Sequence, residues 1–227
     1  MNRIGIVVAV EIGSFIKKYS DKLIEENVNR FKVYSLELNN MTIYITQSGA
    51  GEIRAAACTQ MMISRFNVQL IINYGVAGAL RNDLAVSNTC VVEKVVHYDM
   101  DTSSADNCEI GRYLEYDDIY LRTTSSYVKM VRELDDDIIP VICASGDKFI
   151  ADENRKRELC KQFNADICDM ESAAIVLVCD QNAIPNLLIK TISDSILGGV
   201  SEFRISIEKA SDICLSMIER IISCGLI

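Results

Sequence analysis

Short apolar runs alternate with longer stretches of helical periodicity along the whole chain. Near-continuous apolar runs of this kind are typical of strands that are covered on both faces. They predict buried strands over residues 4–10, 68–75, 140–146 and 186–193. Residues 90–99 alternate apolar and polar side chains and predict another strand. Two further stretches, 31–37 and 41–47, are separated by Asn39-Asn40 and predict a hairpin.

Apolar residues recur with a period near that of an α-helix in the stretches between these strands. The stretches predict helices over residues 14–27, 53–66, 125–137, 152–163, 172–182 and about 202–223. Asp152 is suited to cap the helix that follows it. Because strands alternate with helices, we expect a mostly parallel, layered sheet in a single α/β domain that spans residues 1–227.

The composition supports one large core and excludes two classes of partner. The chain has 227 residues, of which 49% are hydrophobic, and its formal net charge is −9. A protein that neutralises phosphate backbones needs a basic face, so we expect no nucleic-acid partner. No apolar run is long enough to span a bilayer, and the run at the N-terminus predicts a first core strand rather than a signal peptide.

Nine cysteines and a single histidine, His97, restrict the metal and redox chemistry. No two cysteines form a CxxC pair, so neither a zinc site nor a disulfide framework is well supported. Most of the cysteines lie among aliphatic residues, where a thiol behaves as a small apolar group. We therefore expect reduced core thiols, no metal ligands and a cytoplasmic location.

Candidate site residues follow the predicted strands, at the edge of the sheet where parallel α/β proteins bind ligands. The loops there contain Glu11, Gly49-Ala50-Gly51, Gly75-Val76-Ala77-Gly78, Gly146-Asp147-Lys148-Phe149 and Ser193-Asp194. A further acid pair, Asp169 and Glu171, flanks Met170 before an apolar helix. Each feature alone has an ordinary structural explanation, such as a turn glycine or a helix cap. Their joint placement at strand ends favours a site.

These residue types suit the cleavage of a purine N-glycosidic bond. A purine leaves more readily as a neutral base than as an anion, so the reaction needs a positioned acid, for which Asp194 is suited. The ribosyl fragment develops positive charge and needs hydrogen bonds to its hydroxyls, and Glu171 is suited to that task. The ring of Phe149 offers a stacking face for the base, whose edge the backbone at Ile150 can contact.

The order of several segments resembles the 5'-methylthioadenosine/S-adenosylhomocysteine nucleosidases of the nucleoside phosphorylase superfamily. The segments are IGIVVAVE, QSGAGEIRAA, IINYGVAGAL, SGDKFI, CDMESAA and IKTISDS. The resemblance extends from about residue 4 to residue 205, and the SGDKFI, MES and SDS pieces are its most specific parts. It implies a three-layer α/β/α fold with a central mixed, mostly parallel sheet, assembled as a homodimer.

The resemblance also implies a reaction, namely hydrolysis to adenine and a thioribose sugar without metal or cofactor. Asp194 matches the acid that protonates the purine, and Ser193 holds it. Phe203 matches the part of the pocket that receives the 5' substituent, where the apolar Val10 and Ala50 favour a non-polar group. Glu171 and Met170 match the ribose-binding pair, and Phe149 and Ile150 match the base-binding segment. We also expect Gly75, Val76, Ala77 and Lys190 to bind the substrate.

Three positions depart from the family pattern. The family carries a run of acids after its first strand, and the last of them activates the attacking water, whereas this chain has Gly13 there. Glu11 is the acid that remains, and we expect it to need a shifted loop to reach the water. A family serine in the glycine loop is Val76, and a family arginine is Lys190, which keeps the charge but loses the planar fork.

Several alternatives stay open at the level of sequence. A phosphate-dependent phosphorylase needs cationic anchors, for which Arg54 and Arg81 are the nearby candidates. A non-catalytic nucleoside-binding protein is compatible with the change at Gly13. A single histidine and the lack of an acid cluster at ligand spacing argue against a metal-dependent hydrolase. We expect His97 to serve packing or a dimer contact rather than catalysis. The 5' substituent of the substrate is open among methylthio, homocysteinyl, futalosine-like and hydroxyl groups.

Overall fold

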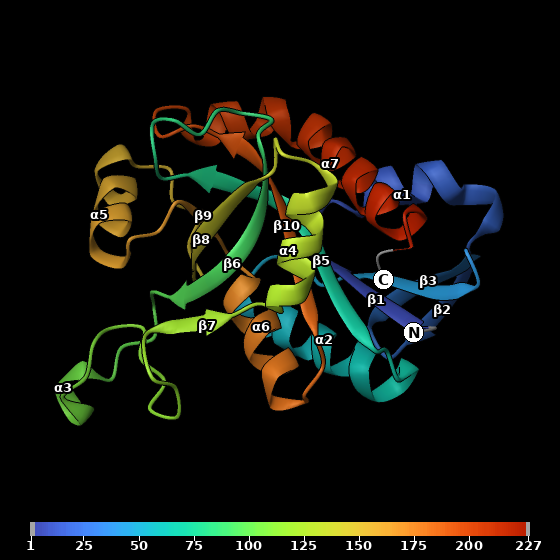
Figure 1. Ribbon diagram of the computed structural model, residues 1–227, viewed down its shortest axis with the longest axis horizontal. Coiled ribbons are helices and arrows are strands. Elements are labelled where there is room, and N and C mark those ends of the chain that lie inside the picture. The colour runs from blue at the N-terminus through green and yellow to red at the C-terminus, as the bar shows by residue number, and fades with distance from the viewer. Residues whose placement is uncertain (1–2, 226–227) are drawn as a thin grey trace.

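A computed structural model describes residues 3–225 and contains one ten-stranded sheet with helices on both of its faces (Figure 1). The strands are β1 Arg3–Val8, β2 Ile24–Val28, β3 Phe31–Leu38, β4 Met41–Gln47, β5 Leu70–Ala79, β6 Thr89–His97, β7 Tyr120–Arg122, β8 Ile139–Ser145, β9 Ile167–Asp169 and β10 Asn186–Asp194. The helices are α1 Ile12–Tyr19, the 3-10 helix η1 Ser20–Lys22, α2 Glu52–Phe66, α3 Ser103–Asp106, α4 Ser125–Leu134, α5 Glu153–Phe163, α6 Ser172–Gln181 and α7 Gly199–Ser223.

The sheet is mixed and closes on itself at one end. Its strand order is β10-β6-β8-β9-β5-β1-β4-β3-β2, and β7 pairs with β6. Because β10 also pairs with β5, the strands β5, β10, β6, β8 and β9 form a ring, from which β1 to β4 extend as an open sheet. Five described pairings are parallel and five are antiparallel. The parallel neighbours of β1 are β4 and β5, so their carboxyl ends meet at one edge.

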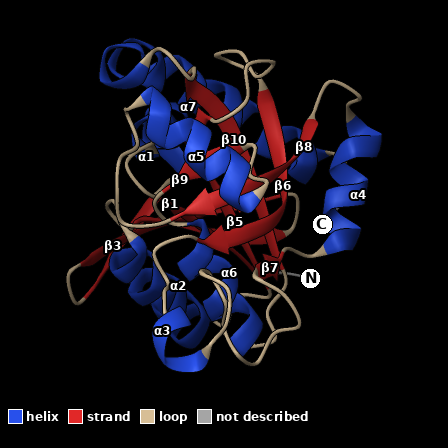
Figure 2. Cartoon of the chain, turned by 90° about the vertical axis from the view of Figure 1, so that its left-hand side faces the viewer, coloured by secondary structure: helices blue, strands red, loops and turns tan. Residues whose placement is uncertain are grey.

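The core lies in two layers because side chains alternate along each central strand. On β1, Ile4, Ile6 and Val8 pack in the cluster that contains residues of α1, α4 and α7. Val7, between them, packs in the cluster built by α2 and α6. Helices therefore cover both faces of the sheet, whereas α5 lies at its β8–β9 end (Figures 1 and 2). The expected three-layer α/β/α architecture is confirmed.

One predicted helix is wrong over part of its length. The predicted helix 14–27 ends at Tyr19, and its second half forms η1 and the edge strand β2. β2 pairs antiparallel with β3, and a residue of positive φ, Asn29, forms the turn between them. The segment is mostly exposed, so its apolar pattern carries little information, and backbone pairing with β3 decides its conformation.

Within residues 3–225 we find no helix with the length and apolar character needed to cross a bilayer. In the same part of the chain, no group of three or more potential ligand side chains is placed to hold a metal ion. All nine cysteines lie in it as free thiols, and those that are buried are Cys58, Cys90, Cys143, Cys168, Cys179 and Cys214. The thiols therefore contribute mainly to the core.

Candidate active site

A cavity of about 160 Å³, here called the site cavity, lies at the carboxyl ends of the central strands. The predicted site residues that line it are Glu11, Ala50, Val76, Ala77, Phe149, Met170, Glu171, Ser193, Asp194 and Phe203. Ile150 lines a small adjoining cavity of about 30 Å³. Gly75 and Lys190 lie beside the lining rather than in it, and both contact residues that line it. The structure thus brings together segments that are far apart in the sequence.

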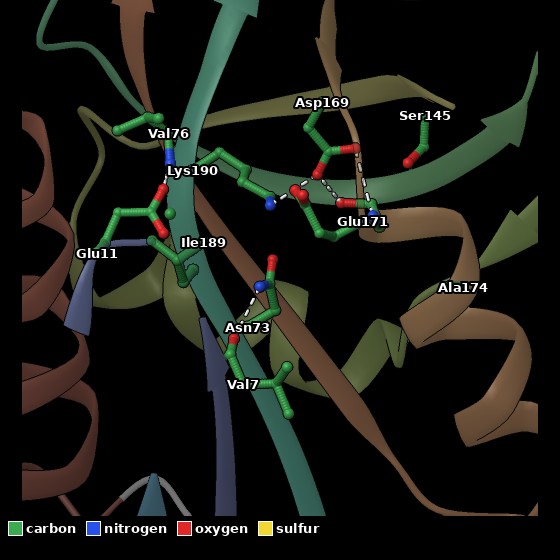
Figure 3. A network of polar contacts seen from close by, with 12 residues as sticks. Val7, Glu11, Asn73, Val76, Ser145, Asp169, Glu171, Ala174, Ile189 and Lys190 are labelled. Atoms are coloured by element: carbon green, nitrogen blue, oxygen red, sulfur yellow. Dashed lines mark hydrogen bonds and ion pairs between the residues drawn. The ribbon is translucent and has the colours of Figure 1, made fainter. Parts of the chain in front are cut away.

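Glu11 stands at the entrance to α1 with its carboxylate turned towards the end of β5 (Figure 3). Its Oε1 accepts a hydrogen bond from the Val76 amide at 3.0 Å, and its Oε2 accepts one from the Val10 amide at 2.8 Å. Gly75 makes room for this carboxylate, since a Cβ there would lie 2.9 Å from Oε1. β1 ends at Val8, two residues before the predicted end of this strand, so Glu11 lies in the loop between β1 and α1.

Gly13 takes no part in the site. It lies on the exposed side of α1, and an added Cβ would meet no atom within 4 Å. A side chain at this position would therefore point into solvent. The carboxylate at this corner of the cavity comes from Glu11, two residues earlier.

Asp194 lines the site cavity and is 2% exposed. Its Oδ1 accepts a hydrogen bond from Ser193 Oγ at 2.8 Å, and its Oδ2 accepts one from Lys156 Nζ at 2.5 Å. The register between β10 and β5 shifts between Ile192 and Asp194, and such irregularities redirect side chains near functional sites. The acid is therefore both part of a buried ion pair and a member of the cavity lining.

A second buried ion pair lies beside the cavity and joins Lys190 to Asp169 at 2.7 Å (Figure 3). Burial alone would raise the pKa of Asp169, but Lys190 and the hydroxyls of Ser172 and Ser145 lower it overall. Burial alone would lower the pKa of Lys190, yet Asp169 and Glu171 raise it. The positive charge predicted for Lys190 is present, and it is directed at Asp169.

Glu171 lines the cavity next to this pair, and its Oε1 accepts a hydrogen bond from the Gly51 amide at 2.9 Å. Burial and the charge of Asp169 raise its pKa to about 7, against the opposing effect of Lys190. Near neutral pH the group is therefore poised between its two forms. Sugar hydroxyls that donate to its oxygens would favour the carboxylate.

Glu52, at the start of α2, is a further buried acid close to Asp169 and Glu171. It accepts hydrogen bonds from Ser145 Oγ at 2.5 Å and from the Ala174 amide at 2.6 Å. Burial and the nearby Asp169 and Glu171 raise its pKa to about 8, although its two hydrogen bonds oppose the shift. It is absent from the lining of the site cavity, so we assign it a structural role.

The Glu52→Gln variant is expected to lose stability less steeply than the native protein as the pH rises. The folded protein retains a proton on Glu52 up to a pKa of about 8, whereas an ordinary glutamate releases it near 4.5. The contribution of the Glu52 proton to the free energy of unfolding is complete below about pH 4.5. It declines as the pH rises to about 8, by up to roughly 1.4 kcal/mol per pH unit.

Urea unfolding of the two proteins at pH 5, 7 and 9 measures this difference. The exposed Glu109 offers the matched control, because Glu109→Gln should leave the pH profile of unfolding unchanged. A native protein and an E52Q variant with parallel profiles would show that Glu52 is not protonated in the folded state.

Aromatic side chains lie at the mouth of the site cavity. Phe149 and Phe203 face each other edge to face, with ring centroids 5.1 Å apart, and both line the cavity. Phe149 is 44% exposed, so a planar ligand that stacked on it would remove apolar surface from water. The lining is mainly apolar between the acids, which suits a base and an apolar substituent.

The two arginines considered as phosphate anchors lie outside the cavity lining. Arg81 forms ion pairs with Asp83 at 2.6 Å and with Asp166 at 2.7 Å. Arg54 is exposed on α2, and its guanidinium lies over Gly49. A Cβ atom added at Gly49 would be 2.6 Å from that guanidinium. Their observed contacts favour structural and surface roles.

His97 ends β6 and lies outside the site cavity. Its Nδ1 is 2.8 Å from the hydroxyl of Tyr113, and the two rings stack with centroids 6.1 Å apart. Burial lowers its pKa, so the ring is neutral at physiological pH. This packing agrees with the non-catalytic role expected for it.

A larger hollow, of about 730 Å³, lies between α4 and the strands β6 to β8. It contains none of the predicted site residues, and charges of both signs line it, among them Lys94, Arg132 and Glu133. Its size alone does not make it a site for the chemistry described here, because the convergent acids and backbone donors lie in the smaller cavity.

Lys156, the partner of Asp194, is not among the site residues predicted from the sequence. The helix α5 is rich in charge, and Lys156 looks like one of its solvated bases. Its spacing carries a signal, however, because Lys156, Leu159 and Phe163 fall on one helical stripe, and all three are buried. A lysine on the apolar stripe of a helix requires a buried partner.

Comparisons with known proteins show the family to which the chain belongs. The family profile described as "Phosphorylase superfamily" matches residues 3–223. A 5'-methylthioadenosine/S-adenosylhomocysteine nucleosidase of Staphylococcus haemolyticus is 33% identical over 201 residues, which cover 84% of this chain and 86% of the relative. An aminodeoxyfutalosine nucleosidase of Campylobacter jejuni is 28% identical over 209 residues, or 89% of this chain and 90% of that one.

Solved structures share the whole fold. A ligand complex of Helicobacter pylori 5'-methylthioadenosine/S-adenosylhomocysteine nucleosidase superposes with a TM-score of 0.92 and 25% identity, and covers 98% of each chain. A futalosine hydrolase mutant of the same species gives a TM-score of 0.92 with 98% and 99% coverage. Fold and site together define a member of the phosphorylase superfamily. Within it, the chain belongs to the family of 5'-methylthioadenosine/S-adenosylhomocysteine nucleosidases.

Proposed function

We propose that this protein hydrolyses the N-glycosidic bond of an adenine nucleoside and releases adenine. The observation that carries the proposal is the convergence of Glu11, Glu171 and Asp194 on one buried cavity. The three carboxylates match the three needs of the reaction: activation of water, stabilisation of the sugar cation and protonation of the base.

Asp194 protonates a ring nitrogen of the base while the bond between the anomeric carbon and the base breaks. The electron pair of that bond moves onto the purine, which leaves as a neutral molecule. Ser193 holds Oδ1 at 2.8 Å and so orients the carboxyl group. Residues whose rotamers are fixed by such contacts act with little reorganisation in the transition state.

Glu11 accepts the proton of the water that attacks the anomeric carbon. In this reading it replaces the acid that the family pattern places at the position of Gly13. The hydrogen bonds from the amides of Val10 and Val76 hold the carboxylate at the cavity wall. Val76 thereby contributes its backbone amide, although its side chain lacks the hydroxyl of the family serine.

Glu171 and Met170 bind the ribose, and the negative charge of the lining favours the cationic sugar of the transition state. Four of the lining residues are acids, namely Glu11, Asp169, Glu171 and Asp194. Lysines form ion pairs with Asp169 and Asp194, which leaves Glu171, in its carboxylate form, to add negative charge to the cavity. Such a lining repels a phosphate dianion, and we therefore prefer water over phosphate as the nucleophile.

The substrate is proposed to carry an apolar 5' substituent, as in 5'-methylthioadenosine. Val10, Ala50 and Phe203 contribute apolar surface to the cavity, and they support this choice. The relatives named above include nucleosidases for both methylthioadenosine-type and futalosine-type nucleosides, so the test compares substrates of both kinds.

We expect the purified protein to release adenine from 5'-methylthioadenosine, S-adenosylhomocysteine or an aminodeoxyfutalosine at the same rate with and without inorganic phosphate. Chromatography of the products distinguishes a free sugar from a sugar 1-phosphate. A strict requirement for phosphate would replace the hydrolase with a phosphorylase. Binding without turnover over many hours would favour the non-catalytic reading instead.

We also propose that the protein is a cytoplasmic homodimer. Ile53 on α2 is 81% exposed and Leu114 is 62% exposed, and a second copy that covered them would remove apolar surface from water. The free thiols fit a reducing compartment. Light scattering coupled to size-exclusion chromatography tests the dimer, for which a mass near twice 25.3 kDa is expected.

A further inference from the structure

Lys156 is a fully buried lysine in a helix whose other basic side chains are at the surface. Its side chain is 0% exposed, whereas Lys161 on the same helix is exposed. Leu159 and Phe163 anchor the same stripe of α5 to the core. An apolar residue of similar volume would pack equally well and would avoid the large desolvation penalty of a buried lysine. The position therefore calls for an electrostatic explanation.

The ammonium group of Lys156 is directed at the acid of the site. Nζ donates to Asp194 Oδ2 at 2.5 Å and to the Ser195 carbonyl oxygen at 2.6 Å. The titratable groups near the pair include Cys168 and Asp169 on β9 and Glu202 on α7, whose carboxylate accepts a hydrogen bond from the Ser195 amide. Lys148 lines the small cavity beside Asp194 and forms an ion pair with Asp99 at 2.9 Å. Burial raises the pKa of the Cys168 thiol to about 12, so it stays neutral.

The contacts of Asp194 raise the question of where the proton for the leaving base comes from. An acid that protonates a leaving base must carry a proton, yet both oxygens of Asp194 accept hydrogen bonds, one from Ser193 and one from an ammonium group. Among these contacts, Lys156 Nζ is the donor that lies against Oδ2, so Lys156 is placed to hand a proton to Asp194.

We propose that Lys156 supplies the proton that the base receives, and that Asp194 passes it on. This inference rests on the proposed hydrolysis. As the glycosidic bond breaks, Lys156 Nζ gives a proton to Oδ2, and the carboxyl group of Asp194 delivers a proton to the ring nitrogen of the purine. The electron pair of the broken bond remains on the purine, and the lysine becomes a neutral amine.

The cycle closes with water as the only other reactant. The attacking water gives its oxygen and one hydrogen to the sugar and its other proton to Glu11. After the products leave, solvent enters the cavity, takes the proton from Glu11 and returns one to Lys156 through Asp194. Lys156 therefore acts through Asp194 and never contacts the substrate.

Two substitutions separate a proton supply from a purely structural ion pair. Lys156→Arg keeps a positive charge next to Asp194, but a guanidinium does not release its proton in proteins. Lys156→Met keeps the volume and removes the charge, so Asp194 must take its proton from solvent. Lys161→Met on the exposed side of α5 is the matched control, and melting temperatures report whether each variant is folded.

The experiment measures kcat and KM for adenine release by the native protein and the three variants between pH 5 and 9. We expect K156R to lose at least about 100-fold in kcat at every pH, with KM within about threefold, on the scale of general acid catalysis. For K156M we expect the ratio of its kcat to the native kcat to fall as the pH rises. This ratio cancels the titration of groups common to both proteins. K161M should match the native protein.

The inference is overturned if K156R retains a native kcat, because charge and position would then suffice without proton release. The inference is also overturned if the ratio of the K156M kcat to the native kcat stays constant with pH. This outcome is decisive even if K156R is too poorly folded to assay. A native protein that releases no adenine from any nucleoside overturns the proposed hydrolysis itself. Failure of the inference and failure of the proposed function are thus distinguished by the native rate.

Discussion

The Asp194→Asn variant is expected to release adenine about 10³-fold more slowly than the native protein, with little change in KM. The amide has nearly the shape of the carboxyl group and can still hydrogen-bond to the base, but it has no proton to give. The loss should therefore appear in kcat, as expected for an interaction made only in the transition state.

The variant also leaves Lys156 without its charged partner in a buried position, which lowers stability. The double variant D194N/K156M removes this unpaired charge, and it should recover part of the melting temperature without recovering kcat. Asp117→Asn, in an exposed loop, is the control for a change of net charge. Wild-type rates for D194N would remove Asp194 from the reaction.

The Glu11→Gln variant is expected to lose kcat by about 10²- to 10³-fold, because glutamine cannot accept a proton from the attacking water. The variant retains one oxygen that can accept from the Val76 amide, but its NH2 group then faces the Val10 amide, so the melting temperature is measured as the control for folding. Steady-state kinetics with the substrate used for Asp194 measures the loss, and KM reports whether binding is preserved.

A glutamate placed at the family position makes this test more specific. Because Gly13 lies on the exposed side of α1, the double variant E11Q/G13E should stay as slow as E11Q. Recovery of activity in the double variant would mean that residue 13 reaches the water and that the role assigned to Glu11 is wrong. Native activity in E11Q alone would lead to the same conclusion.

The architecture was predictable where burial dictates the pattern of residues. The apolar runs at 4–10 and 186–193 correspond to β1 and β10, and Asp152 caps α5 by accepting a hydrogen bond from the Arg155 amide. β2 was not predictable, because an exposed edge strand has no apolar alternation and depends on its partner β3. β7 and β9 are too short to show any period.

The residues that line the site cavity were largely predictable from the sequence, whereas their ion pairs were not. Residues at strand ends were found because parallel topology brings those ends together. The ion pairs of Asp194 with Lys156 and of Asp169 with Lys190 join segments that have no sequence relation, so no local pattern indicates them. The position of the Glu11 carboxylate likewise depends on a loop and on the absence of a side chain at Gly75.

A crystal structure of the D194N variant with bound 5'-methylthioadenosine tests the central claim most directly. The account predicts that the adenine ring lies in the site cavity with a ring nitrogen at hydrogen-bond distance from residue 194. It also predicts that Glu11 contacts a water beneath the anomeric carbon. A nucleoside bound elsewhere, for example in the hollow beside α4, or a base out of reach of residue 194, would contradict the account.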